Sequence, residues 1–216
     1  MANLTPLTET IAAELAAQKR IGMWNGVGAL CGSPSQVRAA KQTIRSVLRK
    51  KTDRITFLSD RKLQFLRTFP RISGVLLNMN VPDLLNTLEG SYGMLKGIPS
   101  EVALPLAYWR NRTNPSRESD IHPARDRCGI TWFSPVIPMT TRDVTAFRSV
   151  IEPIFRDYQF ELCITLTAVS PRCFEATIPL LYDRDNLDEV GRAETCHATL
   201  LRACKAATYF PYRRGI

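Results

Sequence analysis

The chain has 216 residues, of which 44% are hydrophobic, so it can bury a core of its own and is not an intrinsically disordered polypeptide. Lysine and arginine number 29 against 20 aspartate and glutamate residues, and the net charge of +9 favours an anionic partner: nucleic acid, an anionic membrane or a phosphate-bearing cofactor. The basic residues are scattered, and their densest run, Val47 to Arg54, is interpreted as the solvated end of a helix.

The cysteines and the first residues bear on the compartment. The six cysteines include no CxxC pair and no Cys/His cluster with the spacing of a metal site, so we expect reduced thiols. The opening residues contain neither a basic start followed by a long apolar core nor a membrane-spanning run. We therefore expect a cytoplasmic protein with no membrane partner.

The first predicted elements belong to the N-terminal half. A helix is predicted over residues 6–18, where apolar residues recur every four positions after the capping residue Thr5. A strand–helix–strand unit is predicted over residues 21–58. Its helix begins at Ser33, and its second strand is Arg54 to Leu58.

The middle of the chain is less periodic. Prolines and glycines interrupt residues 59–114, which predicts short helices and turns. The polar segment at about 111–126 has no apolar periodicity and is expected to be an exposed loop. We therefore expect a single domain over residues 1–216, with two halves at about 6–110 and 127–208.

The C-terminal half has the clearest pattern. Strands are predicted at 128–139, 160–170 and 173–183, and helices at 140–158 and 186–207, the last capped by Asn186. This order is typical of a ferredoxin-like split βαβ unit. It predicts an α+β fold in which helices pack on one face of an antiparallel sheet. On the strand at 160–170, small hydroxyl side chains such as Thr165 and Thr167 alternate with apolar ones.

Few residues offer chemistry of their own. The sequence has no GxGxxG fingerprint after a strand, no phosphate-binding loop, no GxSxG elbow and no HExxH motif. Its two histidines, His122 and His197, are expected to be structural or exposed. We expect no metal site, and no catalytic centre built on a histidine.

Several stretches of the sequence resemble segments of a known protein family. "CGITWFSPVIPMTTRDV", "FELCITLTAVSPRCFEATIPLLYDRDN" and "ACKAATYFPYRRGI" resemble successive landmarks of the substrate-binding (cap) domain in flavoenzymes of the vanillyl-alcohol oxidase and para-cresol methylhydroxylase family. "WNGVGALCGSPSQVRAAKQTI" and "LEGSYGMLKGIPSEVALPLAYWRN" resemble an earlier part of that domain. The resemblance therefore runs over most of the chain.

This resemblance implies the cap portion of an oxidoreductase that oxidises para-substituted phenols by hydride transfer to flavin-adenine dinucleotide (FAD). The FAD-binding domain is absent from this sequence, so the partners implied are an FAD-binding domain or subunit and a phenolic substrate. We expect the chain alone to bind no FAD, to be inactive and to self-associate. Ile130 falls at the position of the family's histidine, so non-covalent FAD is expected in the complete enzyme.

The resemblance also implies roles for individual residues. Tyr212 and Arg213 match the family's Tyr-Arg pair, which binds the phenolic oxygen and is assigned here as catalytic. Trp132 falls at an aromatic position of the substrate pocket, and Thr165 at a hydroxyl-bearing position.

Two other functions remain open at this stage. The chain could be a free-standing ferredoxin-like binding module whose charge serves nucleic acid. The sequence disfavours this function, because no predicted strand carries an aromatic pair with interleaved basic residues. It could also be a degenerate or split subunit that has no catalysis of its own and docks on a flavin-binding chain.

Overall fold

The computed structural model describes residues 6–19, 22, 24–69, 90, 92–111 and 120–212. The chain divides into two compact units: residues 1–20 with 103–216, and residues 21–102. The sequence predicted a single domain, with two halves at about 6–110 and 127–208 on either side of the polar segment. The observed division comes earlier because Arg110 and Asn111, which precede most of that segment, are buried in the larger unit.

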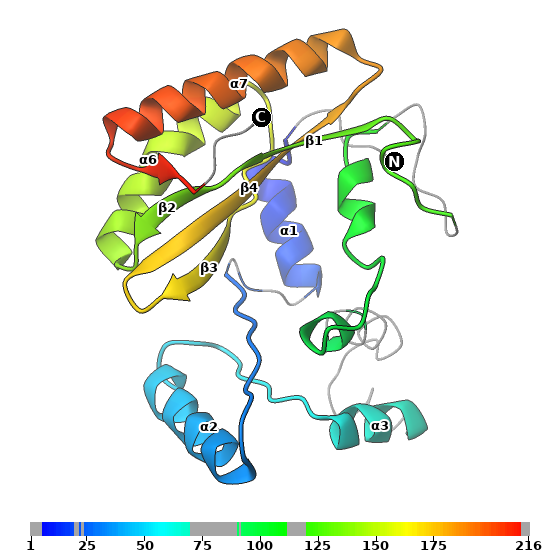
Figure 1. The fold of residues 1–216 in the computed structure, drawn as a ribbon, viewed down its shortest axis with the longest axis vertical. Coiled ribbons are helices and arrows are strands. Elements are labelled where there is room, and N and C mark those ends of the chain that lie inside the picture. The colour runs from blue at the N-terminus through cyan, green and yellow to red at the C-terminus, as the bar shows by residue number, and fades with distance from the viewer. Residues whose placement is uncertain are drawn as a thin grey trace. The chain divides into compact units, whose positions relative to one another are not determined.

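The larger unit is built on an antiparallel sheet (Figure 1). Its strands are β1 (Cys128–Phe133), β2 (Pro135–Pro138), β3 (Thr165–Ser170), β4 (Cys173–Asp183) and β5 (Phe210–Pro211). β1 and β2 pair with β4 in one register, because Phe133 lies opposite Ile178 and Val136 lies opposite Glu175. The single strand predicted at 128–139 is therefore confirmed, with an interruption at Ser134.

The sheet order confirms the predicted α+β architecture. β3 pairs with β4, and β5 pairs with β2, so the order across the sheet is β3, β4, β1/β2, β5. The chain reaches β3 from β2 through helix α6 (Thr141–Asp157), and reaches β5 from β4 through helix α7 (Leu187–Ala206). This is the connectivity of a ferredoxin-like split βαβ unit.

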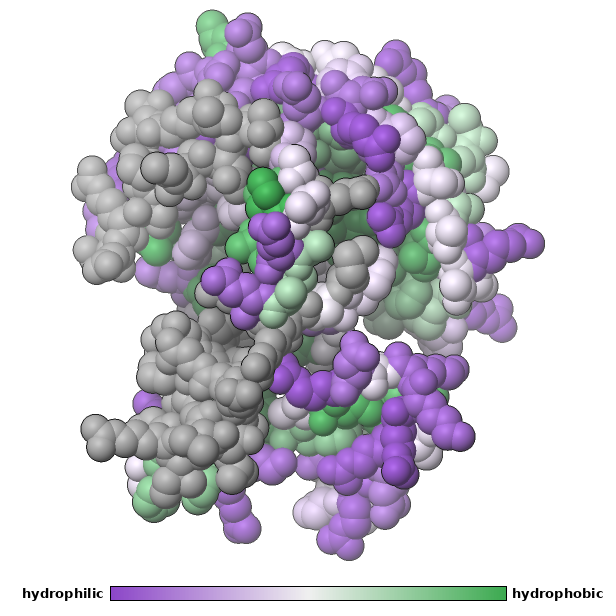
Figure 2. Space-filling model, turned by 180° about the vertical axis from the view of Figure 1, so that it is seen from behind, coloured by the Kyte–Doolittle hydropathy of each residue, from purple (hydrophilic) through white to green (hydrophobic). Residues whose placement is uncertain are grey.

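Both helices lie on the same face of the sheet and form the core with it (Figure 1). Thr140 caps α6, and the Asn186 side chain accepts hydrogen bonds from the Asp188 and Glu189 amides at the start of α7, as predicted. Hydrophilic residues predominate along the top of the molecule in Figure 2, at the height where Figure 1 places α7. The fully buried members of the core include Ile137, Phe147, Ile151, Ala176, Ile178, Leu180, Cys196 and Leu200.

Two shorter elements complete the larger unit. Helix α1 (Glu9–Lys19) begins later than predicted, because the hydroxyl of Thr8 accepts the amide hydrogen of Ile11 at the helix start. The expected cap, Thr5, lies outside the described residues. A 3-10 helix, η1 (Leu104–Tyr108), precedes the first strand of the sheet.

The smaller unit contains α2 (Pro34–Leu48) and α3 (Asp60–Thr68). The predicted start of α2 is confirmed: Ser33 and Gln36 form a reciprocal capping box. The two strands predicted in residues 21–58 are wrong, since none of the described residues in that stretch forms a strand. An isolated apolar run has no neighbour with which to share backbone hydrogen bonds, and no strand of the sheet comes from this unit's described residues.

Candidate functional site

The candidate site is the sheet face opposite α6 and α7. Along β4, Ala176 and Ile178 point into the helix-covered core, so Glu175 and Thr177 point to the other side. The register extends this second face across the sheet. It joins Thr167, Glu175, Val136 and Phe210 in one row, and pairs Thr165 with Thr177 and Trp132 with Pro179. We call the side chains of Trp132, Val136, Thr165, Thr167, Glu175, Thr177 and Phe210 the open face.

Aromatic side chains on this face remain accessible. Trp132 is 50% exposed and Phe210 is 56% exposed, whereas Phe133, the neighbour of Trp132 on the opposite side of the same strand, is 1% exposed. Three threonines and one glutamate surround these rings on the neighbouring strands. The combination offers flat apolar surface beside hydroxyl and carboxylate groups, which suits a planar organic ligand with polar substituents.

The structure brings three of the four sequence-predicted site residues to one region. Trp132 and Thr165 belong to the open face. Tyr212 is two residues beyond Phe210 and is 62% exposed, and its amide donates a 2.7 Å hydrogen bond to the carbonyl oxygen of Ser134. This hydrogen bond holds the segment after β5 beside Ser134, the residue between β1 and β2. Arg213 lies outside the described residues.

One end of this side of the sheet is closed. Cys128, the first residue of β1, packs with Ala107 and Tyr108 of η1 and with Ile121. The side-chain amide of Asn111 donates to the backbone carbonyl oxygen of Asp126 at 2.6 Å and to the Cys128 sulfur at 3.1 Å. Burial raises the pKa of the Cys128 thiol. The accessible part of the side is thus limited to the region around Trp132, β3 and β5.

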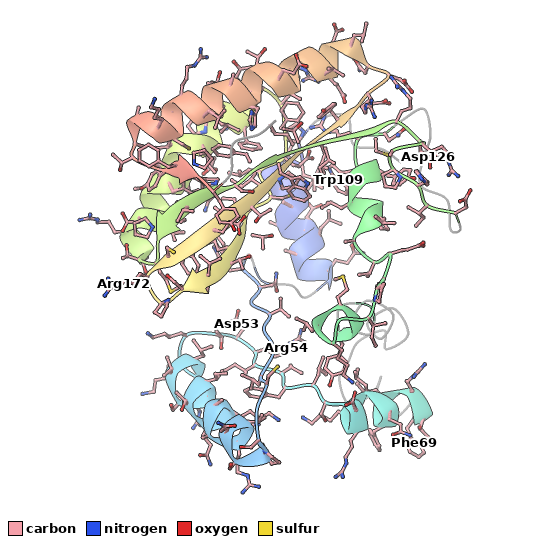
Figure 3. The ribbon with its side chains drawn as sticks, in the orientation of Figure 1. Asp53, Arg54, Phe69, Trp109, Asp126 and Arg172 are labelled. Atoms are coloured by element: carbon pink, nitrogen blue, oxygen red, sulfur yellow. The ribbon has the colours of Figure 1, made fainter. Side chains whose placement is uncertain are left out.

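A polar network holds this closed end in place. Tyr108 donates its hydroxyl hydrogen to the Asp126 carboxylate. The Tyr108 hydroxyl oxygen also accepts the backbone amide hydrogen of His122 at 3.0 Å. Arg125 pairs with both Asp126 and Asp120. The Arg125 guanidinium and then the Tyr108 hydroxyl hold the pKa of Asp126 well below its ordinary value, so the carboxylate stays ionised. Figure 3 shows Asp126 just ahead of β1, where it orders the entry to the strand that carries Trp132.

A buried arginine supports the approach to β3. Arg110 is 1% exposed and donates to the carbonyl oxygen of Gln159 at 2.7 Å and to Glu161 at 3.1 Å. Its guanidinium also lies 5.7 Å from the ring centre of Phe160. Residues 159–161 lead toward Thr165, so Arg110 fixes the chain from which the hydroxyl-bearing strand begins.

Both histidines have structural positions, as expected. His197 lies on α7 with its ring edge-on to Phe133, 6.0 Å between centres, and burial lowers its pKa. His122 Nδ1 accepts the Arg125 amide hydrogen at 3.1 Å. Among the described residues, no three His, Cys, Asp or Glu side chains gather as a metal site. No helix in the described part of the chain has the length and apolar character to cross a membrane.

Glu175 and Phe210 are members of the open face that were not predicted from the sequence. The available signal was the alternation along 173–183, which separates Glu175 and Thr177 from Ala176 and Ile178. Phe210 could not be predicted from a local pattern, because only the pairing of β5 with β2 brings Phe210 beside Val136.

The comparisons with known proteins concern the chain as a whole. No protein-family model matches the sequence. The chain is 34% identical over 217 residues to a 1'-carboxy-chondrochloren decarboxylase from Chondromyces crocatus, a match that covers 100% of this chain and 39% of the relative. The chain therefore spans about two fifths of that relative's length.

A solved structure has the same fold. The crystal structure of p-cresol methylhydroxylase with substrate bound matches with a TM-score of 0.71 and 19% sequence identity, over 99% of this chain and 34% of that one. The chain thus has the fold of one part of p-cresol methylhydroxylase, and the fold that the sequence resemblance implied is confirmed.

Proposed function

We propose that this chain is the substrate-binding cap portion of an FAD-dependent oxidoreductase that oxidises para-substituted phenols by hydride transfer to the flavin. The observation that carries the proposal is that Trp132, Thr165 and Tyr212 are exposed residues of β1, β3 and the segment after β5 in one sheet. The sequence resemblance implies a substrate-binding role for each of these residues. A structure named for p-cresol methylhydroxylase with substrate bound shares the fold.

The chemistry assigned to this chain is the binding and polarisation of the phenol. A Tyr212 hydroxyl and an Arg213 guanidinium that converge on the phenolic oxygen stabilise the phenolate over the phenol. A phenolate pushes electron density toward the para carbon, which makes hydride departure from the para substituent easier. Trp132 supports the ring and excludes water from it, and Thr165 offers a hydroxyl for a polar substituent.

The flavin, when bound, supplies the hydride acceptor. The sequence has no dinucleotide fingerprint or phosphate-binding loop to hold the pyrophosphate. The open face does suit the isoalloxazine side of such a cofactor, because it carries exposed aromatic side chains and is not covered by α6 or α7. We therefore assign FAD binding to a separate domain or subunit, with non-covalent attachment because Ile130 stands at the family's histidine position. All six cysteines are free, which fits a cytoplasmic enzyme.

Decarboxylation is a second candidate. The relative with 34% identity is named a decarboxylase of a carboxylated compound, and the match covers this entire chain. The same face would then hold a substrate that carries a carboxyl group and loses carbon dioxide. Release of carbon dioxide from a carboxylated phenol, measured beside flavin reduction, separates the two reactions.

The test uses the complete or reconstituted enzyme. Arg213→Ala removes a charge-assisted hydrogen bond, so phenolic ligands should bind about tenfold to a hundredfold more weakly, and Tyr212→Phe should cost less. The affinity for the phenol and the rate of flavin reduction are measured for each variant. Arg172→Ala is the control, because Arg172 is exposed in the turn between β3 and β4 (Figure 3). Unchanged binding and reduction in Arg213→Ala would contradict the assigned role.

The isolated chain gives a second check. We expect it to bind neither flavin nor phenol tightly, and to self-associate through its exposed apolar side chains. Absorption spectroscopy after gel filtration and sedimentation velocity measure these properties. A flavin spectrum that survives gel filtration would contradict the assignment of FAD to another domain or subunit.

A further inference from the structure

A row of hydroxyl side chains crosses the side of the sheet that carries the open face. Ser134 lies opposite Thr177, because β1 and β2 pair with β4 in one register. Thr165 of β3 follows on the far side of Thr177. Tyr212 stands at the other end of the row, since the register of β5 with β2 brings it opposite Ser134 and its amide donates to the Ser134 carbonyl oxygen. Neighbouring strands thus place their hydroxyl groups in line.

The adjacent row contains Glu175, the charged member of the open face. Glu175 lies between Thr167 and Val136 and is partly buried, although neither α6 nor α7 covers it. In the described part of the chain, the Glu175 carboxylate has neither a hydrogen-bond donor nor an ion-pair partner. A carboxylate that is partly removed from water without a partner is unfavourable, so a ligand that donates a hydrogen bond to it is stabilised.

The two rows give a bound phenol a direction. The proposed function places the phenolic oxygen beside Tyr212, and Glu175 lies two strands from β5, about 10 Å across the sheet. This span accommodates one aromatic ring with a hydrogen bond at each end. The small side chain of Ser134, between the two ends, leaves room for the ring, and Trp132 lies two residues along the same strand line. The para substituent of such a ring is directed toward Glu175.

We propose that Glu175 selects the para substituent of the phenol: it accepts a hydrogen bond from a hydroxyl or ammonium group and excludes a carboxylate. The inference rests on the proposed function and narrows its substrate class. A hydrogen bond to a carboxylate is stronger than one between neutral groups. A second carboxylate at this place is repelled, because none of the side chains that form the open face is basic. The inference therefore opposes decarboxylation of a carboxyl group at the para position.

The test measures relative affinities in the complete or reconstituted enzyme. The probes are p-cresol, 4-hydroxybenzyl alcohol and 4-hydroxybenzoate, which differ only in the para substituent. In the unchanged protein, the alcohol should bind most tightly, and 4-hydroxybenzoate about tenfold or more weakly than p-cresol. Glu175→Gln removes the charge at nearly constant size, so the ratio of the 4-hydroxybenzoate and p-cresol dissociation constants should fall about tenfold. Glu175→Asp keeps the charge and should preserve the order of the ligands.

Glu194→Gln is the matched control. Glu194 is an exposed carboxylate of α7, on the helix-covered side of the sheet, so its substitution should change the same ratio by less than about twofold. A glutamate on the water-facing side of an antiparallel sheet is common, and an ordinary surface role for Glu175 predicts equal ratios in Glu175→Gln and Glu194→Gln.

The outcomes separate this inference from the proposed function. Failure of all three phenols to bind the unchanged protein overturns both. If p-cresol binds, equal ratios in Glu175→Gln and Glu194→Gln overturn the inference alone, and so does tightest binding of 4-hydroxybenzoate. Loss of all phenol binding in Glu175→Gln also overturns it, because Glu175 would then be required for the ring itself and not for the choice of substituent.

Discussion

The two faces of the sheet differ although the same strands supply both. On β4, alternate residues bury against α6 and α7, while Glu175 and Thr177 face away from these helices. On β1, Phe133 is part of the core and the adjacent Trp132 is half exposed. If the proposed function holds, one side of the strands serves stability and the other serves ligand binding, so a substitution should affect one property or the other according to the side on which its residue lies.

The strongest way to break this comparison is to truncate one phenylalanine on each side of the sheet, Phe147 of α6 on the helix-covered side and Phe210 of β5 on the open face. Phe147 is 0% exposed and its ring centre lies 5.4 Å from that of Tyr209. Phe147→Ala should lower the free energy of unfolding by about 3–5 kcal/mol, because it leaves a cavity in the core. Phe210→Ala, on the open face, should change it by less than about 1 kcal/mol. Urea unfolding measures both, and similar losses would show that the open face is part of the stabilising core.

A second substitution tests the support beneath the open face. Arg110→Met leaves Glu161 and the Gln159 carbonyl oxygen without their buried partner, and should cost about 3 kcal/mol of stability. Arg148→Met is the control, because Arg148 forms a partly exposed pair with Glu152 one turn along α6, worth about 0.5 kcal/mol. Thermal and urea unfolding give the two values. A loss in Arg110→Met no larger than in the control would mean that residues 159–161 are held by other contacts.

The smallest expected effect is a pH dependence of the unfolding free energy that comes from His197 on α7. Burial lowers the pKa of His197, so the unfolded chain binds a proton more readily than the folded one. The stability linked to this group is therefore full above the unfolded pKa of about 6.5 and is lost as pH falls toward the folded value. Unfolding measured at pH 7.5 and 5.5 should show this loss, and His197→Gln should reduce it. His122→Gln, at the other histidine of the chain, should leave it in place. An identical pH dependence in wild type and His197→Gln would contradict the account.

The parts of the fold that sequence could predict are those with local causes. The caps at Ser33, Thr140 and Asn186 and the apolar period of α6 are readable over a few residues. The strands expected in residues 21–58 failed because pairing with a distant segment, and not local composition, decides whether an apolar run becomes a strand. The burial of Arg110 could not be predicted either, because its partners, at 159–161, are distant in the sequence.

The candidate site shows the same limit. Trp132, Thr165 and Tyr212 were found through the resemblance, and the threonine alternation indicated that one side of the strand is polar. Their common location required the register that joins Thr165 to Thr177 and Trp132 to Pro179. Glu175 and Phe210 join the open face only through β2, because Val136 pairs with Glu175 of β4 on one side and with Phe210 of β5 on the other.

The most direct test of the proposed function compares two exposed tryptophans in the complete or reconstituted enzyme. Trp132 is 50% exposed on the open face, and Trp24 is 57% exposed in the smaller unit. The dissociation constant for p-cresol is measured for Trp132→Leu and Trp24→Leu beside wild type. The account predicts that Trp132→Leu weakens binding about tenfold or more, because it removes the aromatic support of the ring, and that Trp24→Leu changes binding by less than about twofold. Equal effects of the two substitutions, or no effect of Trp132→Leu, would contradict a phenol site on the open face.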